Sequence, residues 1–162
     1  MSCDRRISQH ARNCHSGRRV IVARTPHPVP DEVSQNWWNA TSERRLMIQQ
    51  CTRCCHRQHY PRPFCLACNN EQIELVEVSG KGKIHSFTMI ERSAYDNLPV
   101  PYVIALVDLE EGVRLLTRIV DCDPGKLKCD LGVTLRWTKA PGDNDYNLPV
   151  FAPSDDIAKR EL

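Results

Sequence analysis

The sequence has little that would place the protein in a membrane or outside the cell. Among its 162 residues the strongest apolar run, Y-V-I-A-L-V at 102–107, is far too short to cross a bilayer as a helix. The opening residues, M-S-C-D-R-R-I-S-Q-H-A-R, contain no apolar segment of the kind that signal peptides carry. We therefore expect a cytoplasmic protein that makes no contact with a membrane.

Recognised catalytic motifs are also missing. The chain contains no G-x-S-x-G, no phosphate-binding glycine loop, no H-E-x-x-H and no Ser-His-Asp order. Asp108, Glu110 and Glu111 are typical of solvated residues in a hairpin turn. Cys122 has no identifiable base beside it that would make it a nucleophile. These absences argue against an enzyme that acts alone.

Cysteines, by contrast, are plentiful. The chain has nine, and in a reducing compartment clustered cysteines favour metal or redox chemistry over disulfides. Four of them form two C-x-x-C pairs, Cys51 with Cys54 and Cys65 with Cys68. Two such turns bring four thiolates to one tetrahedral centre, which suits zinc. Because four thiolates leave no position for water, we predict a zinc ribbon whose zinc is structural.

Three alternatives stay open for this cluster. A C-x-x-C redox site would need a thioredoxin-like unit, which the sequence does not show. The same four thiolates also accept iron, as in rubredoxin-like sites. Finally, Cys55, His56 or His59 could replace one of the four ligands, although the side chain of Cys55, next to Cys54, should point away from the centre.

The chain divides into four predicted segments. Residues 1–30 form a basic arm and a proline-rich linker, which we expect to be flexible. Residues 31–71 hold a short helix and the zinc ribbon, in which segments at 45–50 and 61–64 would be strands leading into the C-x-x-C turns. Residues 72–153 form a β-barrel, and residues 154–162 form a C-terminal tail.

The helix is expected at 31–43, with two acidic residues at its start, where the helix dipole favours them. Val33 and Trp37, four residues apart, would form its apolar stripe. We expect one of the adjacent Trp37 and Trp38 to pack on the core. The other is a candidate partner contact, since tryptophan is enriched at interface hot spots.

From residue 72 onward the sequence predicts β-strands. Alternating or apolar segments, separated by turn residues, lie at 73–78, 83–91, 102–109, 113–120, 132–138 and 148–151. Five or six short strands with no long helix are typical of a small Greek-key barrel of the OB type. The predicted fold class is therefore mainly β: a helix and a zinc ribbon, followed by an OB-type barrel.

Charge is distributed unevenly along the chain. Residues 1–68 carry eleven Lys or Arg against four Asp or Glu, and residues 69–162 carry eleven against sixteen. Aromatic residues make up only 6% of the chain, and Phe87 and Trp137 stand nearly alone on the predicted strands. OB barrels that bind nucleic acids are more often basic and stack bases on aromatic rings. A nucleic-acid-binding module is therefore the alternative function and not the preferred one.

Several segments together resemble one protein family. They are W-W, R-L-M-I-Q-Q-C-T-R-C, Y-P-R-P-F-C-L-A-C, V-E-V-S-G-K-G-K-I-H-S-F-T and P-Y-V-I-A-L-V-D-L-E-E-G-V-R-L-L-T-R-I-V-D-C-D-P. The family is that of acyl-CoA-associated OB-fold proteins with an N-terminal rubredoxin-like zinc ribbon, and the resemblance covers about residues 31–153. Two departures stand out: Cys55 takes a position where the family usually has glycine, and residues 1–25 lie outside the pattern.

The resemblance implies a function. It implies a non-catalytic accessory subunit of a thiolase-superfamily complex that acts on acyl-CoA, for example in the degradation of aromatic or other acyl-CoA compounds. The thiolase-like partner would supply the nucleophilic cysteine and the acid–base histidine. This chain would bridge subunits and help to enclose the CoA ester, a ligand shared with the partner, while zinc stays structural.

The contacts to CoA or to the partner would come from basic and aromatic side chains, because arginine forks suit phosphates and aromatic faces suit adenine. The candidates are Arg44, Arg45, Arg53, Arg57, Arg62, Lys81, Lys83, Trp37, Trp38, Tyr95 and Tyr102. Arg114 and Arg118 share one strand face with Leu116, and we expect this face to point outward at a partner.

Overall fold

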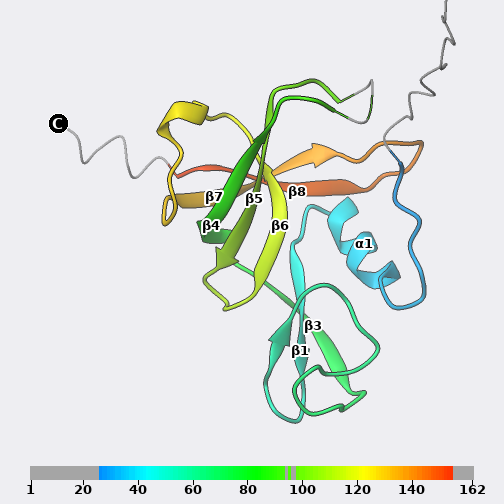
Figure 1. Cartoon of the computed structure of the whole chain (residues 1–162). Coiled ribbons are helices and arrows are strands. Elements are labelled where there is room, and N and C mark those ends of the chain that lie inside the picture. The colour runs from blue at the N-terminus through cyan, green and yellow to red at the C-terminus, as the bar shows by residue number, and fades with distance from the viewer. Residues whose placement is uncertain (1–25, 94, 96–97, 155–162) are drawn as a thin grey trace, which may run out of the picture.

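The computed structural model describes residues 26–93, 95 and 98–154, so the predicted arm at 1–25 and the tail beyond 154 lie outside the described residues. The elements in chain order are α1 (Gln35–Ser42), β1 (Met47–Cys51), β2 (Arg57–Gln58), β3 (Ile73–Glu77), β4 (Lys81–Ile90), β5 (Tyr102–Leu109), β6 (Arg114–Ile119), the 3₁₀ turn η1 (Pro124–Lys126), β7 (Gly132–Lys139) and β8 (Asn147–Pro153). They form a small three-stranded sheet and a closed barrel, with α1 beside the junction (Figure 1). The predicted mainly β fold is confirmed.

The barrel closes in the strand order β4-β5-β6-β8-β7. Neighbouring strands are antiparallel except β6 and β8, which pair in parallel at Ile119 and Phe151 alone. Along β5 every second residue is buried, as expected for a strand with one face toward the barrel interior. Ile84, Val107, Val133 and Phe151, from four different strands, are each at most 2% exposed. The predicted OB-type barrel is confirmed, and apolar side chains fill it.

The chain enters the barrel at a glycine that no other residue could replace without strain. Gly80 has a φ of 70°, in the left-handed region, and a Cβ atom there would lie 2.7 Å from the Cβ of Leu135. Beyond it, β4 pairs with β7 first and with β5 along its length, and a register shift between Ile84 and Ser86 bends the strand. The bend allows β4 to pair with β7 at its start and with β5 along its length, and so to close the barrel.

The small sheet has the order β2-β1-β3 and forms the zinc ribbon. Strand β3, from the segment that the sequence assigned to the barrel, pairs with β1 over its whole length, from Met47 with Glu77 to Cys51 with Ile73. The strand predicted at 61–64 is wrong, because this segment is a loop. Its two prolines lack the N–H groups that a strand ladder requires.

The helix begins later than predicted. The Asp31 carboxylate accepts a hydrogen bond from the Ser34 N–H at 2.8 Å in a turn before the helix, so no acidic residue lies in its first turn. Val33 is 37% exposed, and the predicted Val33–Trp37 stripe does not form. Trp37 is 6% exposed and donates from Nε1 to the Met47 carbonyl at 2.8 Å. The expectation that one tryptophan packs on the core is confirmed.

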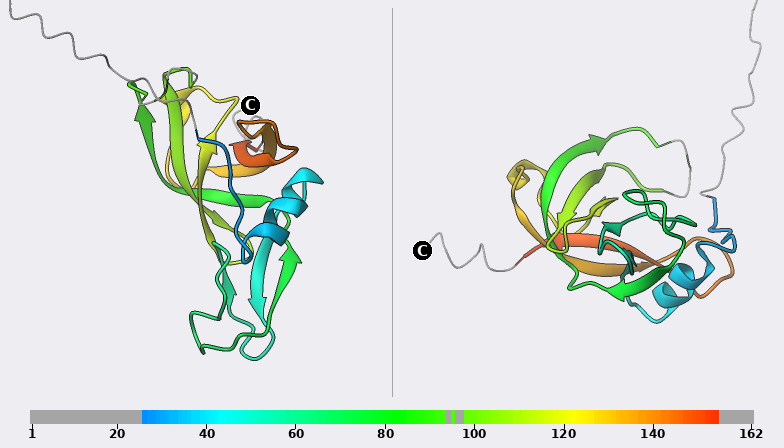
Figure 2. Two further views of the ribbon diagram at one scale, coloured as in Figure 1. Left: turned by 90° about the vertical axis from the view of Figure 1, so that its right-hand side faces the viewer. Right: turned by 90° about the horizontal axis from the view of Figure 1, so that it is seen from below.

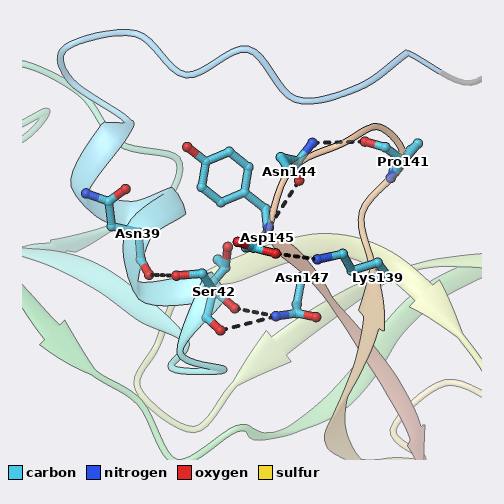
Figure 3. A network of polar contacts seen from close by, with 9 residues as sticks. Asn39, Ser42, Lys139, Pro141, Asn144, Asp145 and Asn147 are labelled. Atoms are coloured by element: carbon cyan, nitrogen blue, oxygen red, sulfur yellow. Dashed lines mark hydrogen bonds and ion pairs between the residues drawn. The ribbon is translucent and has the colours of Figure 1, made fainter.

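Helix α1 connects the ribbon to the barrel. Its Trp37 contacts the ribbon, while its C-terminal end contacts Asn147, whose Nδ2 donates to the carbonyls of Thr41 at 2.9 Å and Ser42 at 3.4 Å (Figure 3). Figure 2 shows the ribbon projecting from one end of the barrel. Within the described residues no helix has the length and apolar character needed to cross a membrane.

Candidate metal centre and apolar groove

Two matching turns present the four predicted metal ligands. The N–H of Cys55 donates to the Cys51 carbonyl at 3.0 Å, and the N–H of Asn69 donates to the Cys65 carbonyl at 2.9 Å. Cys55 and Asn69 both have a left-handed backbone, with φ of 59° and 57°. Glycine and asparagine adopt this conformation most easily. This is a physical reason for a glycine at the position of Cys55 in the family that the sequence resembles.

The four thiol groups converge on one point. The Sγ atoms of Cys51, Cys54, Cys65 and Cys68 lie within 4.8 Å of one another. Two of the separations are 3.7 Å, between Cys51 and Cys68, and 3.6 Å, between Cys54 and Cys65. A tetrahedral zinc ion with Zn–S bonds of about 2.3 Å sets sulfur–sulfur distances of about 3.8 Å. The donor set and its spacing therefore fit one structural zinc ion.

The protonation of these thiols shows why a cation belongs there. The backbone N–H of Cys54, foremost, and the side chain of Asn70 lower the pKa of Cys51 to about 6. The pKa of Cys54 is raised to about 12. A hydrogen bond from the His56 backbone lowers this pKa, but the opposing effects of the neighbouring thiols, led by Cys68, and of burial are together larger. Four thiolates this close repel one another, and a bound metal ion removes the repulsion.

The alternative ligands stay outside the cluster. Cys55 and His56 are exposed, and the metal-ligating group found among the described residues contains only the four cysteines. The His59 ring packs against Trp37 and Tyr60, with centroid distances of 5.5 and 4.1 Å. Burial lowers the pKa of His59 to about 4, so the imidazole is neutral at pH 7. Its place is in the packing between α1 and the ribbon loop.

The predicted basic residues differ in how far their charges are already satisfied. Arg45 donates to Glu77 at 2.9 Å and lies 3.4 Å from Glu43. Arg57 donates from Nε to the Gln50 side chain at 2.9 Å. The other five are exposed and form no ion pair within the described part of the chain: Arg44, Arg53, Arg62, Lys81 and Lys83. These five are the cations that remain available to a phosphate or a partner.

An apolar groove of about 430 Å³ lies where helix α1, the ribbon loop and the barrel meet. Strands β6 and β8 meet at Ile119 and Phe151 and diverge from there, and α1 lies across the opening (Figure 1). The apolar lining includes Trp37, Trp38, Tyr60, Leu116, Leu148 and Pro149. The two predicted tryptophans therefore lie at this site. Tyr60 and Leu148 were missed, because no local pattern marks residues that only the fold brings together.

One cation lines the groove. The guanidinium carbon of Arg118 lies 5.2 Å from the centre of the Tyr102 ring, at a distance typical of a cation–π contact. Its buried Nε has no hydrogen-bond partner within the described residues. Arg118 and Leu116 lie on the outer face of β6, as predicted, but Arg114 on the same face is bound by Asp108 at 2.6 Å. Tyr102 thus holds Arg118, while Tyr95 is half-buried in the loop before β5.

The remaining titratable candidates have structural surroundings. Burial and the neighbouring Asp121 and Asp123 raise the pKa of Cys122, which keeps its thiol protonated, the opposite of an activated nucleophile. The expectation that Glu111 is simply solvated is wrong. Its half-buried carboxylate accepts from the Ser79 N–H at 2.6 Å and so fixes the connection between ribbon and barrel.

Comparison with known families matches both modules. Residues 38–74 match the description "ChsH2, rubredoxin-like zinc ribbon domain", and residues 75–138 match "ChsH2, C-terminal OB-fold domain". Among solved structures, the "Ltp2-ChsH2(DUF35) aldolase" has a chain that is 36% identical, with a TM-score of 0.72 over 78% of this chain and 98% of that one.

Curated relatives match much of the chain. A DUF35 domain-containing scaffold protein of Pyrococcus furiosus is 34% identical over 75% of this chain and 90% of its own length. A probable enoyl-CoA hydratase alpha subunit of Thermomonospora curvata is 36% identical over 80% of this chain, which spans only 40% of that longer protein. The benzoylsuccinyl-CoA thiolase subunit BbsA of Geobacter metallireducens is 31% identical over 60% of this chain and 65% of its own length.

Proposed function

The chain belongs to the DUF35 family of zinc-ribbon and OB-fold scaffold proteins, and on that premise we propose that it is a non-catalytic accessory subunit of a thiolase-superfamily enzyme acting on acyl-CoA. The partner would carry out the chemistry with its own cysteine and histidine. This chain would bridge subunits and help to enclose the CoA ester, in the degradation of an aromatic or other acyl-CoA.

The structural match carries the proposal. The chain aligns with 98% of a DUF35 chain from a structure whose name joins Ltp2 and ChsH2(DUF35) in one aldolase. The name of BbsA places that relative in a thiolase, again as one subunit. A fold that recurs as one component of enzymes of this kind supports an accessory role here.

The chemistry of the described residues agrees with such a role. Four thiolates saturate a tetrahedral zinc, so this centre offers no open position for catalysis. Cys122 is held protonated by burial and by its two acidic neighbours, which raise its pKa. The zinc would instead hold the ribbon in shape, and so hold its exposed loops in position toward a partner.

The outer face of the barrel offers a surface for that partner. Phe87 and Met89 on β4 and Leu116 on β6 are 37%, 45% and 55% exposed. These side chains lie on the two strands that flank β5, and exposed apolar side chains grouped in this way are typical of interaction sites. The five unpaired cations of the ribbon and β4 are the proposed contacts to CoA phosphates, since each carries a charge that no described carboxylate neutralises.

Co-purification tests this function. The tagged chain is isolated gently from its native host, its partners are identified by mass spectrometry, and metal is assayed in the same sample. We expect a stoichiometric thiolase-like partner and about one zinc per chain. A zinc-loaded chain that is recovered alone, or with nucleic acid, would contradict the proposal and favour the nucleic-acid alternative.

A matched pair of variants sharpens the result. Met89→Asp places a charge on the exposed apolar face and should reduce recovery of the partner about tenfold or more, because a buried unpaired charge weakens an interface strongly. Lys128→Asp introduces an acid on the exposed loop between η1 and β7, which contributes no side chain to this apolar group, and should leave recovery unchanged. Equal recovery with both variants would show that the β4–β6 face is not the contact.

A further inference from the structure

We propose that the groove between α1, β6 and β8 is a ligand site intrinsic to this chain, and that it takes organic carboxylates with an apolar body. This inference goes beyond the accessory role, because it requires no partner. It stands on three features of the groove: a preformed aromatic wall, a volume suited to a small molecule, and one cation that has no carboxylate partner among the described residues.

The aromatic wall is fixed before any ligand arrives. The Trp37 indole is held by its hydrogen bond to the Met47 carbonyl, and the Trp38 ring meets it edge-on at 4.9 Å and 86°. On its other side Trp38 packs against Tyr146 at 5.4 Å. Because these rings are already ordered, a ligand that packs on them loses little free energy to further ordering of the protein.

The size and composition of the groove suit a small molecule. Its volume of about 430 Å³ lies within the range of roughly 300–1,000 Å³ that is typical of small-molecule sites, and such sites are mostly apolar with a few polar groups. Leu116 and Leu148 line it from the two diverging strands, and Tyr60 lines it from the ribbon loop. An alkyl or aryl body would replace water along these walls.

The cation defines the polar end of the ligand. Arg118 lines the groove with its Nε buried and unpartnered, and within the described residues it forms no ion pair. The acid that lines the same groove, Asp31, is bound by the N–H and hydroxyl of Ser34. A guanidinium in apolar surroundings favours a carboxylate, which can accept two parallel hydrogen bonds from it. The guanidinium carbon packs over the Tyr102 ring at 5.2 Å, a cation–π contact that favours this position of the side chain.

The test uses the zinc-loaded, full-length chain and 4-phenylbutyrate, with 4-phenylbutanol as a neutral analogue of the same body. The chain has three tryptophans, so ¹⁵N-labelled protein gives three indole N–H signals. We expect 4-phenylbutyrate to shift the Trp38 signal in a saturable way and to leave that of Trp137, which does not line the groove, in place. The alcohol should bind at least about tenfold more weakly, because it cannot form the charge-assisted hydrogen bonds that a carboxylate forms with Arg118.

Variants locate the site. Arg118→Gln should weaken binding of the carboxylate about tenfold and leave the alcohol unchanged, while Arg118→Lys should restore part of the loss. Leu116→Asp, at a 55% exposed position two residues away on the same strand face, should abolish binding, since its carboxylate would occupy Arg118. Arg136→Gln removes a positive charge from an exposed residue outside the groove and serves as the matched control.

Three results would overturn the inference. They are no saturable shift with 4-phenylbutyrate at millimolar concentration, equal binding of acid and alcohol, or equal binding to the wild type and Arg118→Gln. If the small carboxylate fails to bind while a purified partner enzyme shifts the Trp38 signal, the groove is a protein-docking site instead. Co-purification with a thiolase-like partner does not depend on whether the small carboxylate binds, so the two proposals fail separately.

Discussion

The ribbon and the barrel are stabilised in different ways. The barrel buries apolar side chains from every strand, among them Phe151 and Val107 at 0% exposure. In the ribbon, strand β3 has no buried residue, and residues 52–57 between β1 and the start of β2 are exposed. The barrel can therefore rely on the hydrophobic effect, whereas in the ribbon only β1, with Met47 and Ile48, packs in the core, and its exposed loops and β3 need another source of stability.

Hydrogen bonds between side chains and the cluster of four cysteines supply that stability. Two buried glutamines hold the ribbon loop: Gln58 donates to the Gln49 side chain at 2.9 Å, and Gln49 in turn donates to the Arg62 carbonyl at 2.9 Å. In the same ribbon the four cysteines converge on the metal centre. Directional bonds fix the positions of such loops, but each contributes little net stability. The comparison therefore predicts that the two regions respond differently to loss of metal, of apolar contacts and of protons.

Removal of the metal should have the largest effect and should act on the ribbon. Binding of zinc by four thiolates stabilises a small domain by something on the order of 10 kcal/mol at pH 7. We expect a chelator, or Cys65→Ser, to unfold residues of β1 to β3 while the barrel strands keep their amide protection. Hydrogen exchange resolved by residue measures this difference.

One variant serves as the control for metal removal, and two results would contradict the prediction. Cys55→Ser, at an exposed cysteine outside the cluster, should leave metal content and ribbon protection unchanged. If the ribbon keeps its protection without metal, its stability comes from packing on α1 and the barrel. If the barrel unfolds together with the ribbon, the two regions form one cooperative unit and the comparison fails.

A cavity in the barrel should have the second-largest effect. Phe151→Ala removes a fully buried ring from the barrel interior and should lower the free energy of unfolding by about 3–5 kcal/mol. Chemical denaturation of the zinc-loaded protein, followed by circular dichroism, measures it. Leu116→Ala, at a 55% exposed position, should change the stability by less than about 1 kcal/mol. Similar losses for both would show that the barrel does not depend on its interior packing.

These two regions also differ in how well their structure follows from the sequence. The barrel strands could be predicted, because alternation of apolar residues and the turn at Gly112, with its φ of 84°, are local signals. The four metal ligands could be predicted from their spacing alone. Both kinds of pattern are read within one short window; the structure confirms the barrel and brings the four cysteines together.

Features that depend on contacts between distant segments could not be predicted in this way. Nothing local shows that β3 pairs with β1 and not with a barrel strand, or that Asp31 forms a turn with Ser34 ahead of the helix. The groove is a stronger case. Trp38, Tyr60 and Leu148 line it from three distant parts of the chain, and only the divergence of β6 and β8 creates it.

Acid should destabilise the contact between α1 and the ribbon through His59. Burial lowers the pKa of His59 from about 6.5 to about 4, so between these values the unfolded chain binds a proton that the folded chain does not. Stability is then complete above pH 6.5 and is lost as the pH falls toward 4, by roughly 2–3 kcal/mol. Denaturation midpoints measured from pH 7 to pH 4.5 would show this slope.

A variant without the His59 imidazole separates the effect of its protonation from that of the zinc ligands. His59→Phe keeps a ring between Trp37 and Tyr60 but does not titrate. The difference in unfolding free energy between the wild type and His59→Phe should therefore change with pH below 6.5 and stay constant above it. A difference that is constant over the whole range would show that the His59 imidazole is not the buried, neutral group that the packing indicates.

The smallest effect concerns the junction, and it decides how separate the two regions are. Asn147 is 9% exposed and donates to the last carbonyls of α1, at Thr41 and Ser42 (Figure 3). Asn147→Ala removes both bonds, although the Thr41 carbonyl still accepts from the Arg44 N–H at 3.0 Å, and should cost about 1–2 kcal/mol. Asn147→Asp should cost more, because a carboxylate would face two carbonyl oxygens.

If the junction is the weak point, hydrogen exchange of α1 should quicken in both variants while β5 and β6 stay protected. If α1, β5 and β6 quicken equally, the junction transmits the loss, and the ribbon and barrel are stabilised separately but unfold together.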